Sequence, residues 1–122
     1  MRRVAVFALF CAAGLSACSY NMVLAERGGT RMGFGKATSN GHGSGTLEAV
    51  LDGKGFEGTW VSTNESGAIG SVAYQSNDHH GIANAKAADG STVRCEFVFG
   101  GSAGYGSCQD NMGRLYDLQL TR

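Results

Sequence analysis

Apolar and polar residues alternate in short runs through most of this chain. Beyond residue 26 no window holds apolar residues at helical spacing, and the alternating runs recur between clusters of Gly, Asn and Asp. Alternation with a period of two is typical of strands that bury one face. We therefore predict an all-β fold, a small antiparallel meander that forms a barrel or a sandwich. The predicted strands span residues 21–26, 31–37, 44–51, 55–63, 68–75, 81–87, 91–99, 105–109 and 114–121.

Three segments look like copies of one hairpin when they are aligned on a turn glycine, Gly53, Gly90 or Gly113. An apolar side chain follows each glycine by three residues and again by seven. Side chains alternate across a strand, so these positions should share one face, and glycine suits a turn that needs a positive φ. The predicted core comprises Leu47, Leu51, Phe56, Trp60, Val93, Cys95, Phe97, Tyr116, Leu118 and Leu120. The opposite face should carry Glu57, Arg94, Glu96, Asp117 and Gln119.

The N-terminus has the layout of a secretory signal. Arg2 and Arg3 precede an apolar stretch, residues 4–15, that ends in small residues. This stretch has 12 residues, whereas a helix needs roughly 20 to span a bilayer. The signal ends at Leu15-Ser16-Ala17-Cys18, which resembles the lipobox of bacterial lipoproteins. An ordinary cleaved signal with a chance cysteine is the alternative.

The lipoprotein resemblance implies a cleaved signal helix at residues 1–17 and a lipid on Cys18, which becomes the mature N-terminus. We expect residues 18–43 to form a Gly-rich tether with weak strands and residues 44–122 to form the antiparallel β domain. Several acyl chains on one cysteine make anchoring effectively permanent. Ser19 stands where aspartate is associated with inner-membrane retention, so the sequence resembles the outer-membrane sorting pattern. The expected location is the outer membrane, facing the periplasm.

The cysteines predict one disulfide. Cys11 leaves with the signal and Cys18 is consumed by the lipid, so Cys95 and Cys108 remain. Export favours disulfides, and two thiols are too few for the four-ligand site that zinc usually requires. A Gly-rich link over residues 99–104 allows the chain to reverse so that both cysteines face each other on neighbouring strands. The last third of the chain also resembles small exported β-rich proteins of proteobacteria whose function is unknown.

Composition and charge narrow the range of functions. The 122 residues include 20 Gly and no Pro, with 43% hydrophobic and 16% charged residues, which indicates one small domain. Collagen-like, highly charged disordered and polytopic membrane chains are excluded. Ten Lys and Arg are scattered among ten Asp and Glu. The basic patch expected of a nucleic-acid-binding protein is therefore absent from the sequence.

Three local patterns are candidates for chemistry. Residues 100–104 match G-x-S-x-G, the nucleophile elbow of many hydrolases, but the chain continues as a strand rather than a helix, which favours a hairpin loop. Asp78, His79 and His80 are weak candidates for metal ligands, because adjacent histidines in a strand point to opposite faces. We expect residues 75–81 to be an exposed polar loop instead. Glu48 and Glu57 should oppose each other across the first repeated hairpin, and we interpret them as solvent-facing.

The favoured function is a non-enzymatic outer-membrane lipoprotein with a binding or envelope-maintenance role. Its expected partners are the membrane, through the lipid, and a periplasmic or envelope protein, with no nucleic acid and no cofactor. One alternative is a periplasmic inhibitor of a hydrolase such as lysozyme, by analogy of architecture alone. A less favoured alternative is a metal-binding protein that uses the histidines at positions 79 and 80.

Overall fold

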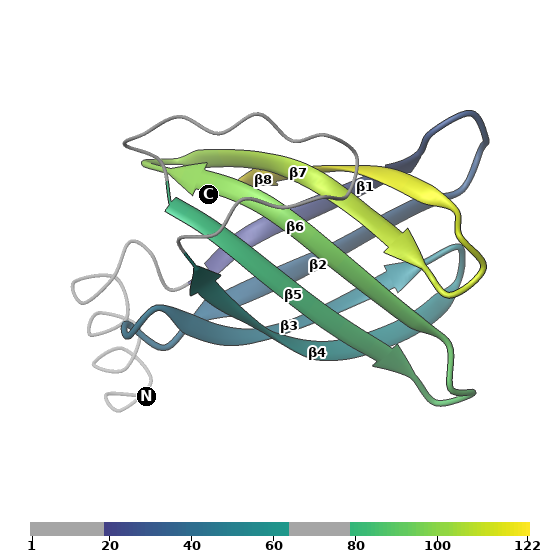
Figure 1. The fold of residues 1–122 in the computed structure, drawn as a ribbon, viewed down its shortest axis with the longest axis horizontal. Helices are drawn as coiled ribbons and strands as arrows, with labels where there is room; N and C mark the ends of the chain where they lie inside the picture. Colours follow the sequence, from purple (N-terminus) through teal and green to yellow (C-terminus); the bar gives the residue numbers. More distant parts are fainter. Residues whose placement is uncertain (1–18, 64–78) are drawn as a thin grey trace, which may run out of the picture.

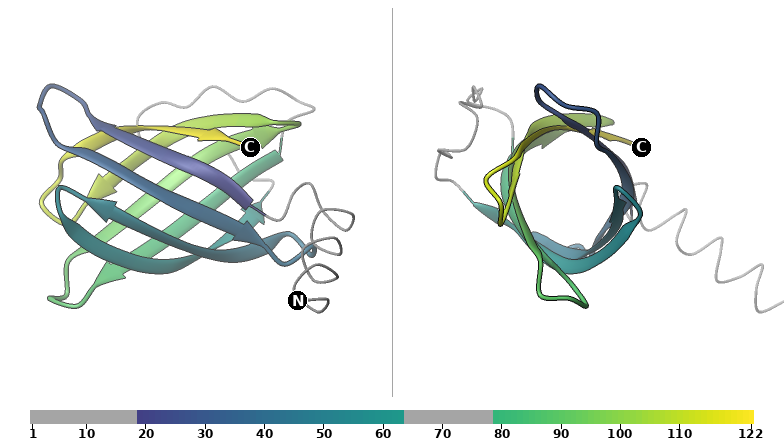
Figure 2. Two further views of the ribbon diagram at one scale, coloured as in Figure 1. Left: turned by 180° about the vertical axis from the view of Figure 1, so that it is seen from behind. Right: turned by 90° about the vertical axis from the view of Figure 1, so that its right-hand side faces the viewer.

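The computed structural model describes residues 19–63 and 79–122, which form a closed barrel of antiparallel strands (Figure 1). Each strand pairs with its neighbours in sequence, and the last strand closes the ring by pairing with the first (Figure 2). The strands are β1 (Ser19–Glu26), β2 (Met32–Ser39), β3 (Ser44–Leu51), β4 (Lys54–Thr63), β5 (His79–Ala87), β6 (Thr92–Gly100), β7 (Ala103–Asp110) and β8 (Leu115–Thr121). The predicted all-β meander is confirmed, and of the two predicted forms, a barrel or a sandwich, the structure is a barrel. The predicted strand at 68–75 lies outside the described residues.

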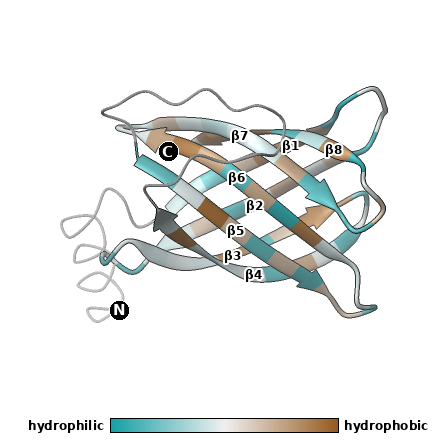
Figure 3. Cartoon of the chain, in the orientation of Figure 1, coloured by the Kyte–Doolittle hydropathy of each residue, from teal (hydrophilic) through white to brown (hydrophobic). Residues whose placement is uncertain are grey.

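The predicted core is confirmed, because all ten of its members are buried inside the barrel. Hydrophobic and hydrophilic residues alternate along the strands (Figure 3). Most outward-facing positions are polar or charged. No helix in residues 19–63 and 79–122 is long and apolar enough to cross a membrane.

The turns of the three repeated hairpins confirm the role of their glycines. Gly53, Gly90 and Gly113 have φ angles of 82°, 91° and 86°, a region that side chains rarely allow. Asp52 also has a positive φ, of 52°, as a tight two-residue hairpin turn requires. The sequence pattern therefore identifies both the turns and the faces of the strands that follow them.

One residue of the predicted outer face behaves differently. Glu96 occupies an outward position of β6, between Ile82 on β5 and Ser107 on β7, yet it is only 5% exposed. Its carboxylate lies 3.5 Å from the guanidinium of Arg94, an exposed neighbour on the same strand. The prediction that Glu96 lies on the face opposite to the core is confirmed, but its low exposure could not be predicted, because alternation assigns a face of the strand and not what covers that face.

The prediction of a tether is wrong for residues 19–39, whereas the strands predicted within it, over residues 21–26 and 31–37, are confirmed. β1 and β2 are full members of the barrel wall, and β1 pairs with both β2 and β8. The inward positions of β2 include Gly33 and Gly35, whereas Phe34 between them faces outward. A Cβ on Gly35 would lie 2.7 Å from the Cβ of Ala49, so these glycines permit close approach of β3. β2 therefore has glycines on its inner face and large side chains on its outer face, and its sequence resembles that of a flexible linker although it forms a strand.

The predicted disulfide is confirmed. Cys95 on β6 and Cys108 on β7 are directly opposite each other, and their sulfur atoms are 2.01 Å apart. Both side chains point into the barrel, where Cys108 has no exposed surface. The turn between the two strands contains residues 101 and 102, so the G-x-S-x-G sequence forms a hairpin loop and not a strand-to-helix elbow.

Candidate functional site

The barrel interior is a packed core. Its cavities have volumes of about 20 Å³ each, and all the residues that line them are apolar. A volume of roughly 10–15 Å³ is the minimum for one water molecule, and small-molecule sites usually measure about 300–1,000 Å³. An eight-stranded barrel is just wide enough for side chains to fill it. The interior therefore has no space for an organic ligand without rearrangement of its side chains.

A polar network surrounds Asp110 at the end of the barrel that carries the β3–β4, β5–β6 and β7–β8 turns. This carboxylate accepts hydrogen bonds of 2.9 Å from the backbone N–H groups of Met112 and Arg114, from the Arg114 Nε and from the Tyr116 hydroxyl. Burial alone would raise the pKa of Asp110, but these hydrogen bonds outweigh it and hold the pKa below its usual value. Burial and the same hydrogen bond raise the pKa of Tyr116. The hydrogen bonds of this network lie within the β7–β8 hairpin, so we infer that the network stabilises the fold.

Replacing Asp110 with Asn should destabilise this hairpin. We expect the free energy of unfolding at neutral pH to fall by about 1.5–3 kcal/mol, because hydrogen bonds to a charged acceptor are lost. A carboxyl whose pKa is lower in the folded state contributes stability above its unfolded pKa of about 3.9, and that contribution is lost as the pH falls through the folded value. Urea unfolding across this acidic range should therefore show a steeper loss for the wild type than for D110N. The exposed Asp117, paired with Arg27, is the control, and D117N should change little.

A hollow crosses the outer wall over β2 to β5, and we call it the Gly55 hollow. Its volume is about 730 Å³. Phe34 and Val50 stand beside it, 60% and 52% exposed, on paired positions of β2 and β3. Gly55 continues this row on β4 and contributes no side chain, and the space above it is open. The complete lining is Phe34, Gly35, Lys36, Glu48, Ala49, Val50, Gly55, Phe56, Glu57, Lys86, Ala87 and Ala88.

A row of four charges borders the Gly55 hollow. Lys36, Glu48, Glu57 and Lys86 are directly opposite one another on β2, β3, β4 and β5, in that order. The opposition of Glu48 and Glu57 confirms the sequence expectation. Like charges at directly opposed positions destabilise a sheet, whereas Lys36 opposite Glu48 and Lys86 opposite Glu57 offset part of this repulsion. No ion pair within 4.0 Å involves either carboxylate in the described part of the chain. Two directly opposed carboxylates are a locally unfavourable arrangement of the kind expected at functional sites.

The histidines proposed as weak metal ligands do not converge. His79 and His80 are the first residues of β5 rather than part of a loop, so their side chains leave opposite faces of the wall. The His79 ring lies 5.4 Å from that of Phe99, and Asp78 and Cys18 are outside the described residues. Within residues 19–63 and 79–122 no group of three His, Cys, Asp or Glu residues is arranged to hold a metal ion.

The comparisons with known proteins support the fold. No family model and no curated protein shows significant similarity to the chain. Solved structures that resemble it include the redesigned β-barrel mFAP1 bound to DFHBI, with 12% identity, a TM-score of 0.59, and coverage of 91% of this chain and 98% of that one. The redesigned barrel b11L5F_LGL has 13% identity, a TM-score of 0.59, and coverage of 91% and 94%. A de novo designed fluorescence-activating β-barrel has 12% identity, a TM-score of 0.57, and coverage of 91% and 96%.

Sequence reasoning missed the apolar part of the Gly55 hollow. The sequence places Phe34 in a strand but not on a face, because its neighbours Gly33 and Gly35 give no hydrophobic contrast. The available signal is the spacing of Met32, Phe34 and Lys36, large side chains that alternate with glycine and therefore share the outer face. Gly55, two residues after the turn glycine, gives no sign that it leaves an open space.

Proposed function

We propose that this protein is a non-enzymatic binding protein of the bacterial envelope that is anchored by a lipid on Cys18 and holds a protein partner at the Gly55 hollow. One observation carries the binding site: exposed Phe34 and Val50 lie beside a hollow whose border includes two directly opposed carboxylates. An apolar centre with a charged rim is the usual anatomy of a protein interface.

The geometry indicates what the partner must present. An apolar side chain fits the open space above Gly55, between Val50 and the end of β5. A neighbouring Lys or Arg of the partner would relieve the repulsion between Glu48 and Glu57. The open space above Gly55 and the two carboxylates together favour a partner surface in which a basic residue adjoins an apolar one. A hydrolase inhibited by this protein is one such partner, so that alternative uses the same surface.

The outer wall is a better candidate than the barrel interior. Two of the similar designed barrels are described as bound to DFHBI, a small molecule. At 8–13% identity the likeness carries over the fold only, and the cavities inside this barrel measure about 20 Å³ each. The Gly55 hollow, of about 730 Å³, is large enough to receive side chains of another molecule.

Site-specific crosslinking in the native envelope tests this function. A photoreactive residue at exposed Thr46, near Glu48 on β3, should capture one stoichiometric protein partner. The double variant E48K/E57K should reduce the yield by about tenfold or more, because it opposes the partner's cation. Cys18→Ala should abolish both acyl labelling and membrane association.

The matched control places the same photoreactive residue at exposed Gln109 on β7, which lies across the eight-stranded ring from β3. Capture of the same species from both positions, or a yield that the charge reversal leaves unchanged, would contradict the binding site. A crosslink to a second copy of this chain, or to lipid alone, would contradict the proposed partner class. Acyl labelling of Cys18→Ala would refute the anchor.

A further inference from the structure

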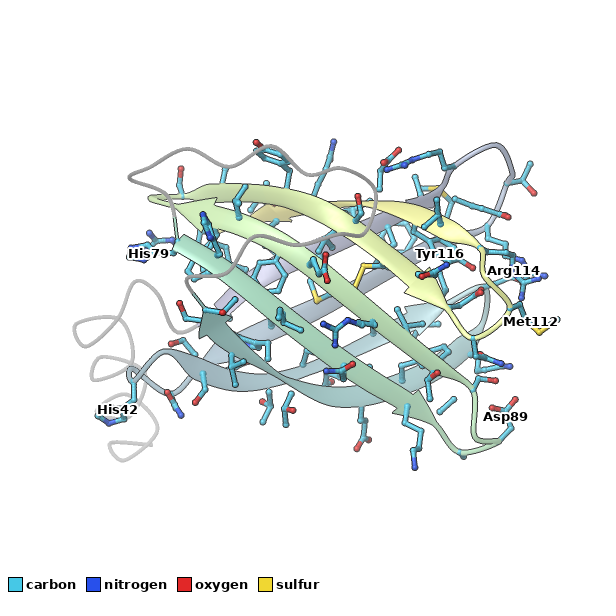
Figure 4. All side chains as sticks on the ribbon, viewed as in Figure 1. His42, His79, Asp89, Met112, Arg114 and Tyr116 are labelled. Carbon is cyan, nitrogen blue, oxygen red and sulfur yellow. A yellow bond between two sulfur atoms is a disulfide. The ribbon has the colours of Figure 1, made fainter. Side chains whose placement is uncertain are left out.

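The two ends of the barrel differ in where the described acidic residues and histidines lie. We call the end at which β1 begins and β8 ends the termini end; it includes Ser19, residues 40–43, the start of β5, residues 100–103 and Arg122 (Figure 1). All three histidines of the chain are found there, and Figure 4 shows His42 and His79 at this end. The acidic residues of the described ranges lie instead on the wall or at the other end, where Figure 4 labels Asp89. Glu65 and Asp78 belong to the segment that is not described.

Aromatic side chains fill the barrel at the termini end. The Phe99 ring is 5.9 Å from Trp60, 6.0 Å from Tyr20 and 5.7 Å from Phe97. Trp60 also donates a 3.1 Å hydrogen bond from its indole Nε1 to the backbone carbonyl oxygen of Thr38. Trp60 is buried, whereas Tyr20 is partly exposed, and Tyr is one of the residues enriched at membrane–water interfaces.

The C-terminal arginine is fixed over this aromatic cluster. The Arg122 guanidinium lies 5.4 Å from the centre of the Tyr20 ring, and its Nε donates a 3.0 Å hydrogen bond to the carbonyl oxygen of Gly101. The Tyr20 hydroxyl donates to the same oxygen at 3.1 Å. A cation is therefore held beside a tyrosine at the rim, an arrangement suited to contact with lipid phosphates.

The proposed anchor point adjoins this end. β1 begins at Ser19, the residue directly after Cys18, so no tether separates the barrel from the lipidated residue. One extended residue spans at most about 3.6 Å. We call the opposite end, which holds residues 27–31, 52–53, 88–91 and 111–114, the turn end. A lipid on Cys18 would therefore hold the termini end, rather than the turn end, against the bilayer.

We propose that the termini end of the folded barrel docks on the anionic lipid headgroups of the membrane that anchors it. Arg122 contacts lipid phosphates, and Tyr20 lies at headgroup level. The Gly55 hollow, built from the start of β2, the end of β3 and the start of β4, then lies in the half of the barrel farther from the membrane. The docking depends on the proposed lipid anchor, which brings the barrel to the membrane, and it gives the anchored barrel a defined orientation.

The chain's single tryptophan, Trp60, reports on this contact. Lipidated protein is reconstituted in phosphatidylglycerol–phosphatidylethanolamine vesicles with brominated acyl chains, and its fluorescence is compared with that in unbrominated vesicles. We expect quenching of Trp60 that weakens when phosphatidylcholine replaces the anionic lipid. The variant M112W adds a tryptophan at a residue that is 69% exposed at the turn end (Figure 4). Its fractional quenching should be lower than that of the wild type, since the added indole lies far from the bilayer.

A charge variant tests the role of Arg122. R122Q should lower the ratio of docked to undocked barrel about fivefold, the effect of one cation near an anionic surface. R27Q removes the same charge at the β1–β2 turn and should leave the quenching unchanged. Equal quenching in the wild type and M112W, or no effect of R122Q on protein that floats with the vesicles, would overturn the docking alone. Protein that does not float would refute the anchor and the docking together.

Discussion

Replacing Gly58 with alanine is expected to lower the free energy of unfolding by about 3 kcal/mol or more. The alanine Cβ would lie 2.6 Å from the Cα of Ala85 on β5 and closer still to the carbonyl oxygen of Asn84. Both obstacles are backbone atoms of a paired strand, so relief requires β4 and β5 to move apart. For a domain of this size the midpoint of thermal unfolding should fall by about 12 °C or more.

Gly55 provides the matched control for this change. It lies on the same strand, three residues before Gly58, and a Cβ at this position would meet no atom within 4 Å. Gly55→Ala should therefore change the stability by less than about 0.5 kcal/mol. Thermal and urea unfolding of both variants measure the two changes in stability. Equal stability of G58A and G55A would show that β4 and β5 are not as close as described.

Removing the disulfide should have an effect of similar size. We expect C95A/C108A to lower the free energy of unfolding by about 3 kcal/mol, because the unfolded chain loses a crosslink that closes a short loop. The two cysteines are separated by 13 positions in the sequence. Urea unfolding of the double variant, compared with the oxidised wild type, measures the difference.

The buried position of the disulfide leads to a second expected result. Cys95 and Cys108 lie inside the barrel wall, so a reductant reaches the bond only when the barrel opens. Folded protein should therefore resist reduction, whereas wild type reduced in urea and kept reduced should match the stability of C95A/C108A. Two thiols that react with an alkylating agent in the folded, unreduced protein would show that the bond is absent.

Local features of this barrel follow from its sequence alone. Alternation assigns Phe56, Val93 and Tyr116 to the inner face, where all three are buried, and the turn glycines of the three repeated hairpins have positive φ. The Gly-rich link between Cys95 and Cys108 correctly predicts that they lie on neighbouring strands. Each of these features depends on residues close together in the chain, where the two-residue period of a strand and the steric demands of a turn act directly.

Features that depend on curvature and closure emerge only in the folded barrel. Pairing of β1 with β8 joins opposite ends of the described chain, and it makes residues 19–39 barrel wall instead of a tether. Glycines such as Gly35 face inward where a neighbouring backbone comes close, which reverses the hydrophobic pattern of β2. The carboxylates of Glu48 and Glu57 can be paired from sequence, but the open space beside them exists because outer-face residues of β2, β3 and β4 meet across three strands. Local periodicity contains no information on the distance between strands, so the hollow on the outer wall could not be predicted from it.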